Sequence, residues 1–347
     1  MSQTMIVDRP PASRGSDFAH LSERIKQAGL LGRRPGYYAL RIGLVVAAYA
    51  GAWAAFARLG DSWWQLLVAA ALAVIFAQVA LVAHDLAHRQ VFASRKPSEI
   101  AGLLAGNLGI GMSYGWWVDK HTRHHANPNH EDHDPDVAPD ILIWSTDQAR
   151  ASKGVPRFIG RHQAYLFFPL LLLEGLNLHV SGARALRRRG IRHRAAELTL
   201  FTAHVLGYLG VVFAMLPPGK AVAFIAVHQG LFGLYLGCTF APNHKGMPMA
   251  TDDMDYLRKQ VITSRDVSGG RLVDLALGGL NHQIEHHLFP NMPTPNLRRA
   301  KPIVRAYCDE IGVPYAESSL VASYRQALTH LHRVGAPLRG DRVGRRP

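Results

Sequence analysis

The chain has 347 residues, of which 48% are hydrophobic and 18% are charged, and its formal net charge is +14. The hydrophobic content excludes an intrinsically disordered chain. Cys238 and Cys308 are too few and too far apart for a disulfide framework or a thiolate zinc site. The unusual feature of the composition is its 19 histidines.

The first sixteen residues are polar and carry no pattern of a secretory signal, so we expect a disordered tail over residues 1–16. Apolar residues then recur at helical spacing among charged residues over 17–31. This pattern predicts an amphipathic helix, which lies either on a membrane surface or against a protein core.

Two long apolar runs follow, over residues 37–60 and 63–83, and a short polar turn joins them. Each run has the length of about twenty residues that crosses a bilayer as a helix, so the pair predicts a transmembrane hairpin. The next apolar run, 100–117, is shorter and carries four glycines, Gly102, Gly106, Gly109 and Gly111. It is typical of a buried or re-entrant segment.

Three more apolar runs cover residues 163–180, 197–216 and 221–242. An arginine-rich segment, 184–194, separates the first two, and short segments of this kind belong on the cytoplasmic side. The run 163–180 also contains Glu174, which is costly in lipid, so we expect an interfacial or re-entrant helix there. The other two runs predict a second hairpin, which makes four spans with both termini in the cytoplasm.

The predicted fold class is therefore all-α: a polytopic integral membrane protein with four transmembrane helices and a cytoplasmic helical cap. We expect one membrane domain over residues 17–332 and a disordered basic tail over 333–347, which is rich in Gly, Pro and Arg. Cytoplasmic segments that face an anionic leaflet explain the basic excess. No pattern indicates a nucleic-acid partner.

Histidines gather in four short segments: HDLAH at 84–88, HTRHH at 121–125, NHKG at 243–246 and HQIEHH at 282–287. Histidines three or four residues apart lie close together on a helix. The predicted topology puts all four segments at or beyond the cytoplasmic ends of the spans. The candidate metal ligands are His84, His88, His121, His124, His125, His244, His286 and His287.

Eight imidazoles suffice for two metal ions with four ligands each, so we predict a dinuclear centre in the cap. Imidazole ligands suit Fe, Zn, Cu or Ni and do not suit Mg or Ca. Asp85, Asp119 and Glu285 adjoin candidate ligands and are expected either to accept the second ring N–H of an imidazole or to be ordinary solvated charges. His130 and His133 are interpreted as loop histidines.

The three histidine boxes, in this order and with the last continuing into Leu288-Phe289-Pro290, resemble those of the membrane-bound fatty acid desaturase family. The resemblance extends over residues 17–324. Gln283 stands where other branches of the family have a histidine, as in the front-end enzymes. His282 occupies a position that is usually not a ligand, so it is left out of the predicted set.

The resemblance implies an enzyme with two iron ions that uses O₂ and two electrons to remove two hydrogens from a fatty acyl chain, carried as acyl-lipid or acyl-CoA. The candidate ligands other than His244 are then also the catalytic residues. The sequence has no His-Pro-Gly-Gly motif of a fused haem domain. We therefore expect a separate electron donor, such as a ferredoxin or a cytochrome with its reductase. Tyr114, Trp116 and Trp117 are candidates for lining the acyl tunnel.

Two alternatives stay open from the sequence. A lipid or carotenoid hydroxylase or ketolase would use the same histidine boxes and differ only in its product. A zinc-dependent membrane hydrolase needs fewer ligands, and a metal transporter would place its ligands near the bilayer midplane.

Overall fold

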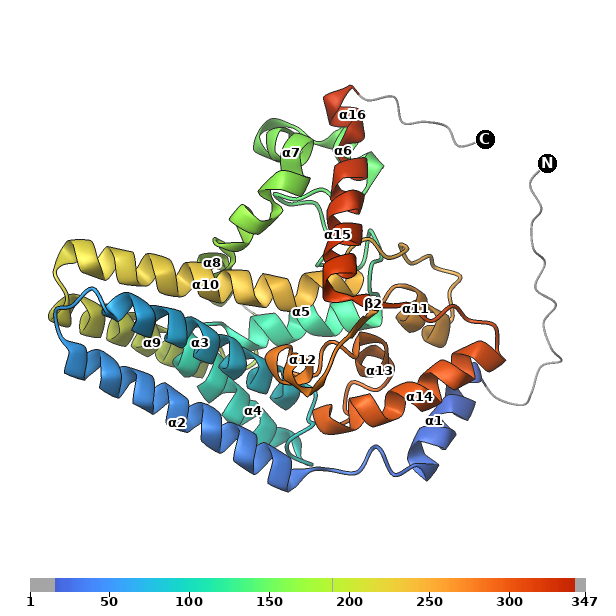
Figure 1. Ribbon diagram of the computed structural model, residues 1–347, viewed down its shortest axis with the longest axis horizontal. Coiled ribbons are helices and arrows are strands. Elements are labelled where there is room, and N and C mark those ends of the chain that lie inside the picture. The colour runs from blue at the N-terminus through green and yellow to red at the C-terminus, as the bar shows by residue number, and fades with distance from the viewer. Residues whose placement is uncertain (1–15, 189, 341–347) are drawn as a thin grey trace.

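A computed structural model describes residues 16–188 and 190–340 of the chain (Figure 1). The described residues form helices and two three-residue strands. Residues 1–15, which hold nearly all of the first expected tail, and residues 341–347, which hold the end of the second, lie outside the described part.

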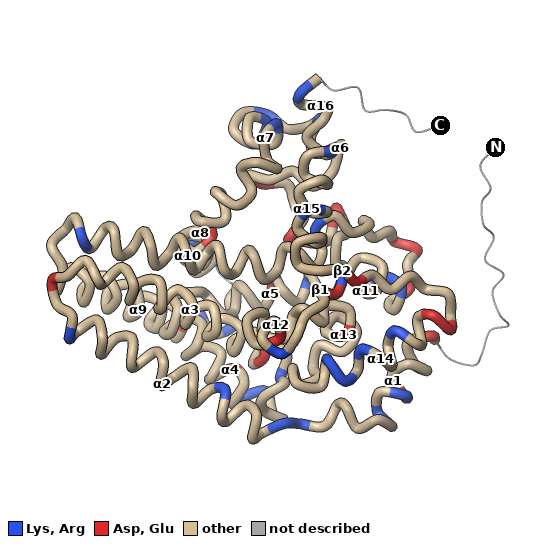
Figure 2. Tube along the Cα trace, in the orientation of Figure 1, with Lys and Arg blue, Asp and Glu red and all other residues tan. Residues whose placement is uncertain are grey.

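Four helices are long and apolar enough to cross a membrane. They are α2 (Pro35–Leu59), α3 (Gln65–Ala87), α9 (Arg194–Met215) and α10 (Pro218–His244). They coincide with the four predicted spans, which are thereby confirmed as long apolar helices. Few charged residues lie along them; most charges lie in the cap and at the end of the bundle next to it, and a few lie in the turns at the opposite end (Figure 2).

Helix α3 is the central span and packs against α2 and α10. Phe76 in its middle is fully buried and contacts the rings of Tyr49, His228 and Phe232. The outer helix α2 instead exposes large apolar side chains such as Leu44, as a lipid-facing helix does.

The segment expected not to cross forms two helices, α7 (Gly154–Leu171) and α8 (Glu174–Arg187), which meet at an angle of 85°. Helix α8 packs closely on α10. Glycine at position 233 permits this approach, since a Cβ atom there would lie only 2.4 Å from the backbone nitrogen of Gly175. This bend is compatible with the predicted re-entrant or interfacial segment.

The glycine-containing run is likewise broken. It comprises α4 (Arg95–Leu103), the π-helix η1 (Leu104–Gly109) and the first residues of α5 (Tyr114–Ala126). Gly111 turns the chain between them with a φ of 64°. Glu197 of α9 fixes the start of α5, since its carboxylate accepts hydrogen bonds from the Ser113 hydroxyl at 2.7 Å and the Gly115 backbone N–H at 3.1 Å.

Short helices, most of them from the C-terminal part of the chain, form a cap that covers one end of the spans and also extends to one side of them (Figure 1). The cap helices are α1 (Asp17–Gln27), α6 (Thr146–Ala151), α11 (Tyr256–Ile262), α12 (Arg271–Ala276), α13 (Gln283–Leu288), α14 (Thr294–Glu310), α15 (Leu320–Val334) and α16 (Ala336–Arg339). Strand β1 (Asp266–Ser268) pairs in parallel with β2 (Glu317–Ser319).

The amphipathic helix predicted over 17–31 is present as α1, and the structure decides between its two expected environments. Its apolar residues Leu21 and Ile25 are fully buried and belong to one core with Val304 of α14. Helix α1 thus packs against protein.

The boundary expected at residue 333 differs from the structure. Helix α15 continues to Val334, and α16 packs against α6 and α7 with Leu338 buried. A sequence rich in Gly, Pro and Arg is helical here because α16 buries an apolar side chain between two other helices.

The contacts of Glu197 generate a prediction about stability. Glu197→Ala leaves the buried donors of Ser113 and Asn107 without this acceptor, and we expect the free energy of unfolding to fall by about 3 kcal/mol. Thermal unfolding in detergent, followed by tryptophan fluorescence, measures the effect. The exposed Glu23 of α1 is the control, and an equal loss in Glu23→Ala would contradict the assignment.

Candidate metal centre

The eight candidate ligands come from four elements that meet where the spans join the cap. The end of α3 supplies His84 and His88, and α5 supplies His121, His124 and His125. The last residue of α10 is His244, and α13 carries His286 and His287. The structure brings all eight together, while their role as ligands stays a prediction.

The eight side chains form two groups in which potential ligand atoms lie within 4.8 Å of one another. The larger group, called here the five-histidine group, comprises His84, His88, His121, His125 and His286. The smaller one, the three-histidine group, comprises His124, His244 and His287.

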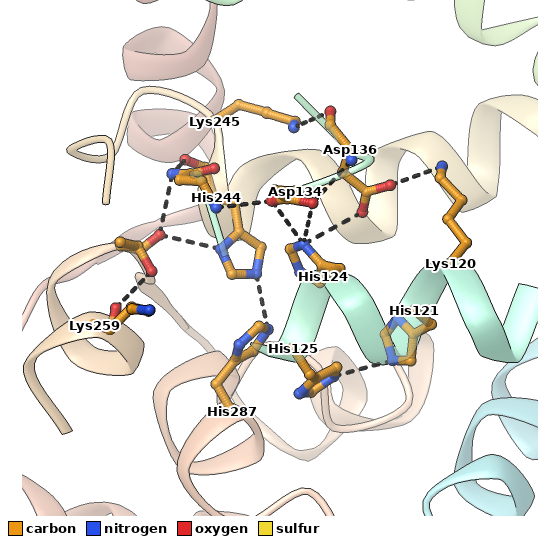
Figure 3. Close-up of polar contacts among 12 residues, drawn as sticks. Lys120, His121, His124, His125, Asp134, Asp136, His244, Lys245, Lys259 and His287 are labelled. Carbon is orange, nitrogen blue, oxygen red and sulfur yellow. Dashed lines mark hydrogen bonds and ion pairs between the residues drawn. The ribbon is translucent and has the colours of Figure 1, made fainter. Parts of the chain in front are cut away.

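In the five-histidine group the Nε2 atoms point at one another. Those of His84 and His286 are 3.1 Å apart, and those of His88 and His121 are 2.9 Å apart. In the three-histidine group the Nε2 atoms of His244 and His287 are 3.1 Å apart (Figure 3). The rings of His125 and His287 stack at 4.2 Å, so the two groups adjoin. This arrangement fits two neighbouring metal ions.

Burial controls the charge of these imidazoles. Loss of water lowers the pKa of His121, His125, His286 and His287 well below the ordinary value, and neighbouring imidazoles lower it further. Their neutral form is therefore favoured, and neutral imidazole is the form that binds a metal. A cluster of crowded, neutral imidazoles suits transition metals.

His124 has a different environment. Burial acts to lower its pKa, but the charge of Asp134 and a hydrogen bond to it raise the pKa above the ordinary value. The Nδ1 atom of His124 lies 2.9 Å from Asp134, which also accepts the backbone N–H of Asn129 at 2.8 Å (Figure 3). The carboxylate thus fixes one ring nitrogen and leaves the other for a ligand position.

Two further acceptors hold imidazoles of the three-histidine group. The side-chain oxygen of Gln260 lies 2.9 Å from Nδ1 of His287, and the carbonyl oxygen of Thr263 lies 3.1 Å from Nδ1 of His244. Sequence reasoning missed both of these and Asp134. The only local signal was the acidic run 131–136, which was interpreted as a loop.

Of the three carboxylates predicted to support ligands, only Asp85 contacts one, at 3.3 Å from Nδ1 of His84. Asp119 is exposed and pairs with Arg123 on the outer side of α5, so it is the solvated charge of the alternative expectation. Glu285 fits neither expectation, because it is buried and bonds to Tyr315 at 2.8 Å. Adjacency in sequence does not bring these two side chains to the ligand face of their helices.

Gln283, at the start of α13, belongs to the three-histidine group by position. Its side-chain nitrogen is 2.8 Å from Nε2 of His244, and its side-chain oxygen accepts a hydrogen bond from Asn243 at 3.1 Å. The three-histidine group therefore has one amide side chain beside its three imidazoles.

His282 lies outside both groups, and its Nε2 atom is 3.2 Å from Asp274. His130 and His133 also lie apart, with His130 bonded to Asp252 at 3.0 Å. Trp117, a candidate for the acyl tunnel, stacks on the ring of His121 with 4.5 Å between centroids. The other two candidates, Tyr114 and Trp116, line a cleft beside α5.

Fold and site together define a class: a helical polytopic membrane protein with a histidine-rich candidate dinuclear metal centre where its spans join the cap. Within that class, the sequence profile of the family described as "Fatty acid desaturase" matches residues 61–319. The chain belongs to the fatty acid desaturase family.

Similar proteins carry desaturase names. The chain is 31% identical over 279 residues to the acyl-lipid (9-3)-desaturase of Physcomitrium patens, which covers 78% of this chain and 53% of that protein. It is 27% identical over 330 residues to fatty acid desaturase 3 of Bos taurus, and this match covers 92% of this chain and 73% of that protein. It is 29% identical over 280 residues to the Delta(8)-fatty-acid desaturase of Helianthus annuus, covering 75% and 60%. The chain thus spans about half of the Physcomitrium patens protein.

The contact between Asp134 and His124 generates a prediction about metal retention. Asp134→Asn removes the charge that orients the imidazole, and we expect metal affinity to fall about 10- to 100-fold. Elemental analysis of the purified protein after dialysis against a graded chelator measures bound metal. Asp119→Asn, at the exposed carboxylate of α5, is the control and is expected to retain wild-type metal content.

Proposed function

We propose that the protein is an O₂-dependent fatty acyl desaturase, an oxidoreductase whose eight histidines and two iron ions form its active site. The observation that carries the proposal is the pair of adjoining imidazole groups in a chain of this family. Zinc is redox-inert, so the removal of hydrogen from a methylene group requires a redox-active metal.

The overall reaction balances with one O₂, two electrons and two protons. A CH₂–CH₂ unit of the acyl chain becomes CH=CH, and two water molecules form. Iron, when bound, supplies the activation of O₂. The histidine centre has no electron source of its own, so a donor protein, such as a ferredoxin or a cytochrome with its reductase, delivers the two electrons.

The protein's own residues hold and orient the centre. The five-histidine group would hold one ion, and the three-histidine group, with Gln283 beside it, would hold the other. Asp134 and Gln260 fix the orientation of two rings through Nδ1. Five of the eight imidazoles are buried, which restricts the access of water and thereby limits side reactions.

The product distinguishes this proposal from a hydroxylase on the same scaffold. We expect a host that expresses the wild type and a compatible donor to accumulate an acyl chain two mass units lighter than its saturated precursor. His124→Ala, which removes a ligand, is expected to abolish this product. Gas chromatography with mass detection of fatty acid methyl esters measures both.

The control variant is His162→Ala, because His162 is exposed on α7 and lies outside both histidine groups. It is expected to keep the wild-type product profile. A product heavier by one oxygen would establish the hydroxylase instead, and turnover by His124→Ala would exclude the centre as the site of reaction.

We also propose that the centre and both termini face the cytoplasm. The support is the arginine-rich segment 184–194, which joins α8 to α9 at the end of the bundle that carries the histidines. The test variant is Gly190→Cys, made in a background in which Cys238→Ser and Cys308→Ser remove the two native thiols. Its thiol is expected to resist an impermeant reagent in intact cells and to react after lysis. Labelling in intact cells would show that this segment faces away from the cytoplasm and would contradict the proposed orientation.

A further inference from the structure

A cleft of about 640 Å³ lies beside α5, away from the candidate metal centre. It is bordered by the end of α3, by α4 and by the segment between α8 and α9. The α5 residues that line it include Trp116, Asp119 and Arg123, whereas His121 and His125 of the same helix belong to the centre. Its volume is within the range of about 300–1,000 Å³ that small-molecule sites occupy.

The lining of the cleft combines two kinds of side chain. The partly exposed side chains of Trp116, Val118 and Ile191 form an apolar wall, and arginines from three segments face it. A site with an apolar wall and a cationic rim suits an amphiphile that has a fatty chain and an anionic head.

Most of the charges in the cleft neutralise one another. Glu99 pairs with Arg192 at 2.8 Å and also with Arg95, and Asp119 pairs with Arg123 at 3.2 Å. The Glu197 carboxylate is buried and bonded to Ser113 and Gly115, and within residues 16–188 and 190–340 it forms no ion pair with an arginine.

Two arginines remain. Within residues 16–188 and 190–340, the guanidinium groups of Arg89 and Arg188 make no ion pair and no hydrogen bond, and both line the cleft. They are exposed, so their charges are available to a ligand.

The depth of these two arginines relative to the membrane is set by the helices. Arg89 follows the last residue of α3, Ala87, by two positions, and Arg188 precedes α9, which begins at Arg194. Both charges therefore lie just beyond the ends of spans, where lipid phosphates are found.

We propose that this cleft binds an anionic phospholipid, with its phosphate between Arg89 and Arg188 and an acyl chain along the wall of Trp116, Val118 and Ile191. A guanidinium group matches the geometry of phosphate oxygens by donating two parallel hydrogen bonds. The binding requires no metal and no turnover, so a binding measurement tests it separately from the proposed activity.

The test uses the full chain, purified in a neutral detergent without added metal, and native mass spectrometry with dioleoyl phosphatidylglycerol as the probe. We expect one tightly bound lipid per chain and weaker binding of dioleoyl phosphatidylcholine, which has no net charge. The double variant Arg89→Gln/Arg188→Gln is expected to bind phosphatidylglycerol about 10- to 30-fold more weakly.

A charge-matched control is Arg299→Gln/Arg325→Gln, which removes two exposed arginines on α14 and α15, outside the cleft. It is expected to keep wild-type affinity. Thermal unfolding verifies that both double variants fold, which their exposed positions favour. The single variants Arg89→Gln and Arg188→Gln are each expected to lose part of the affinity.

Three results would overturn the proposal. Equal loss of binding in the two double variants would mean attraction by overall charge. Equal binding of the two lipids by the wild type would show that the net negative charge of the lipid headgroup does not determine binding. Displacement of the lipid by millimolar inorganic phosphate would assign the cleft to a soluble anion.

Discussion

Eight imidazoles packed together, five of them buried and three partly exposed, are the constraint on which the rest of this structure depends. Ring nitrogens of neighbouring residues lie about 3 Å apart, as between His84 and His286 and between His244 and His287. Like charges at that distance repel, and burial disfavours a charge, so a lowered pKa favours the neutral form of His121, His125, His286 and His287. His124 differs, because Asp134 raises its pKa. A shared ion turns this crowding into a favourable arrangement.

Asp85, which contacts one imidazole of this cluster, lies where the membrane bundle meets the cap. Asp85 on α3 contacts His84, pairs with Arg41 of α2 at 2.8 Å and accepts a hydrogen bond from Thr294 of α14 at 3.1 Å. A single carboxylate therefore ties one span, the next span and a cap helix to a candidate ligand. Removing it would leave the Arg41 guanidinium buried without its ionic partner, which is costly.

The sequence predicts the features of this structure that neighbouring residues determine, and it does not predict those that depend on residues far away in the chain. The spans follow from the length of uninterrupted apolar runs, and the histidine boxes follow from spacing along a helix. Asp134 illustrates the limit, because it lies in an irregular segment whose course is set by Asn129, with a φ of 55° and side-chain hydrogen bonds to the carbonyl groups of His244 and Thr263. Those partners are more than a hundred residues away, so no local pattern reveals which carboxylate reaches His124. Asp119 and Glu285 were chosen for adjacency, which does not determine the face of a helix.

The distribution of the ligands along the chain sets an order for biogenesis. By the time residue 125 has been synthesised, four members of the five-histidine group exist, but the fifth, His286, comes from α13. The three-histidine group also waits for α13, which supplies His287. All four spans precede α13 in the chain. Neither half of the candidate centre can therefore be completed before all four apolar helices have been synthesised, so the full histidine cluster forms only late in the synthesis of the chain.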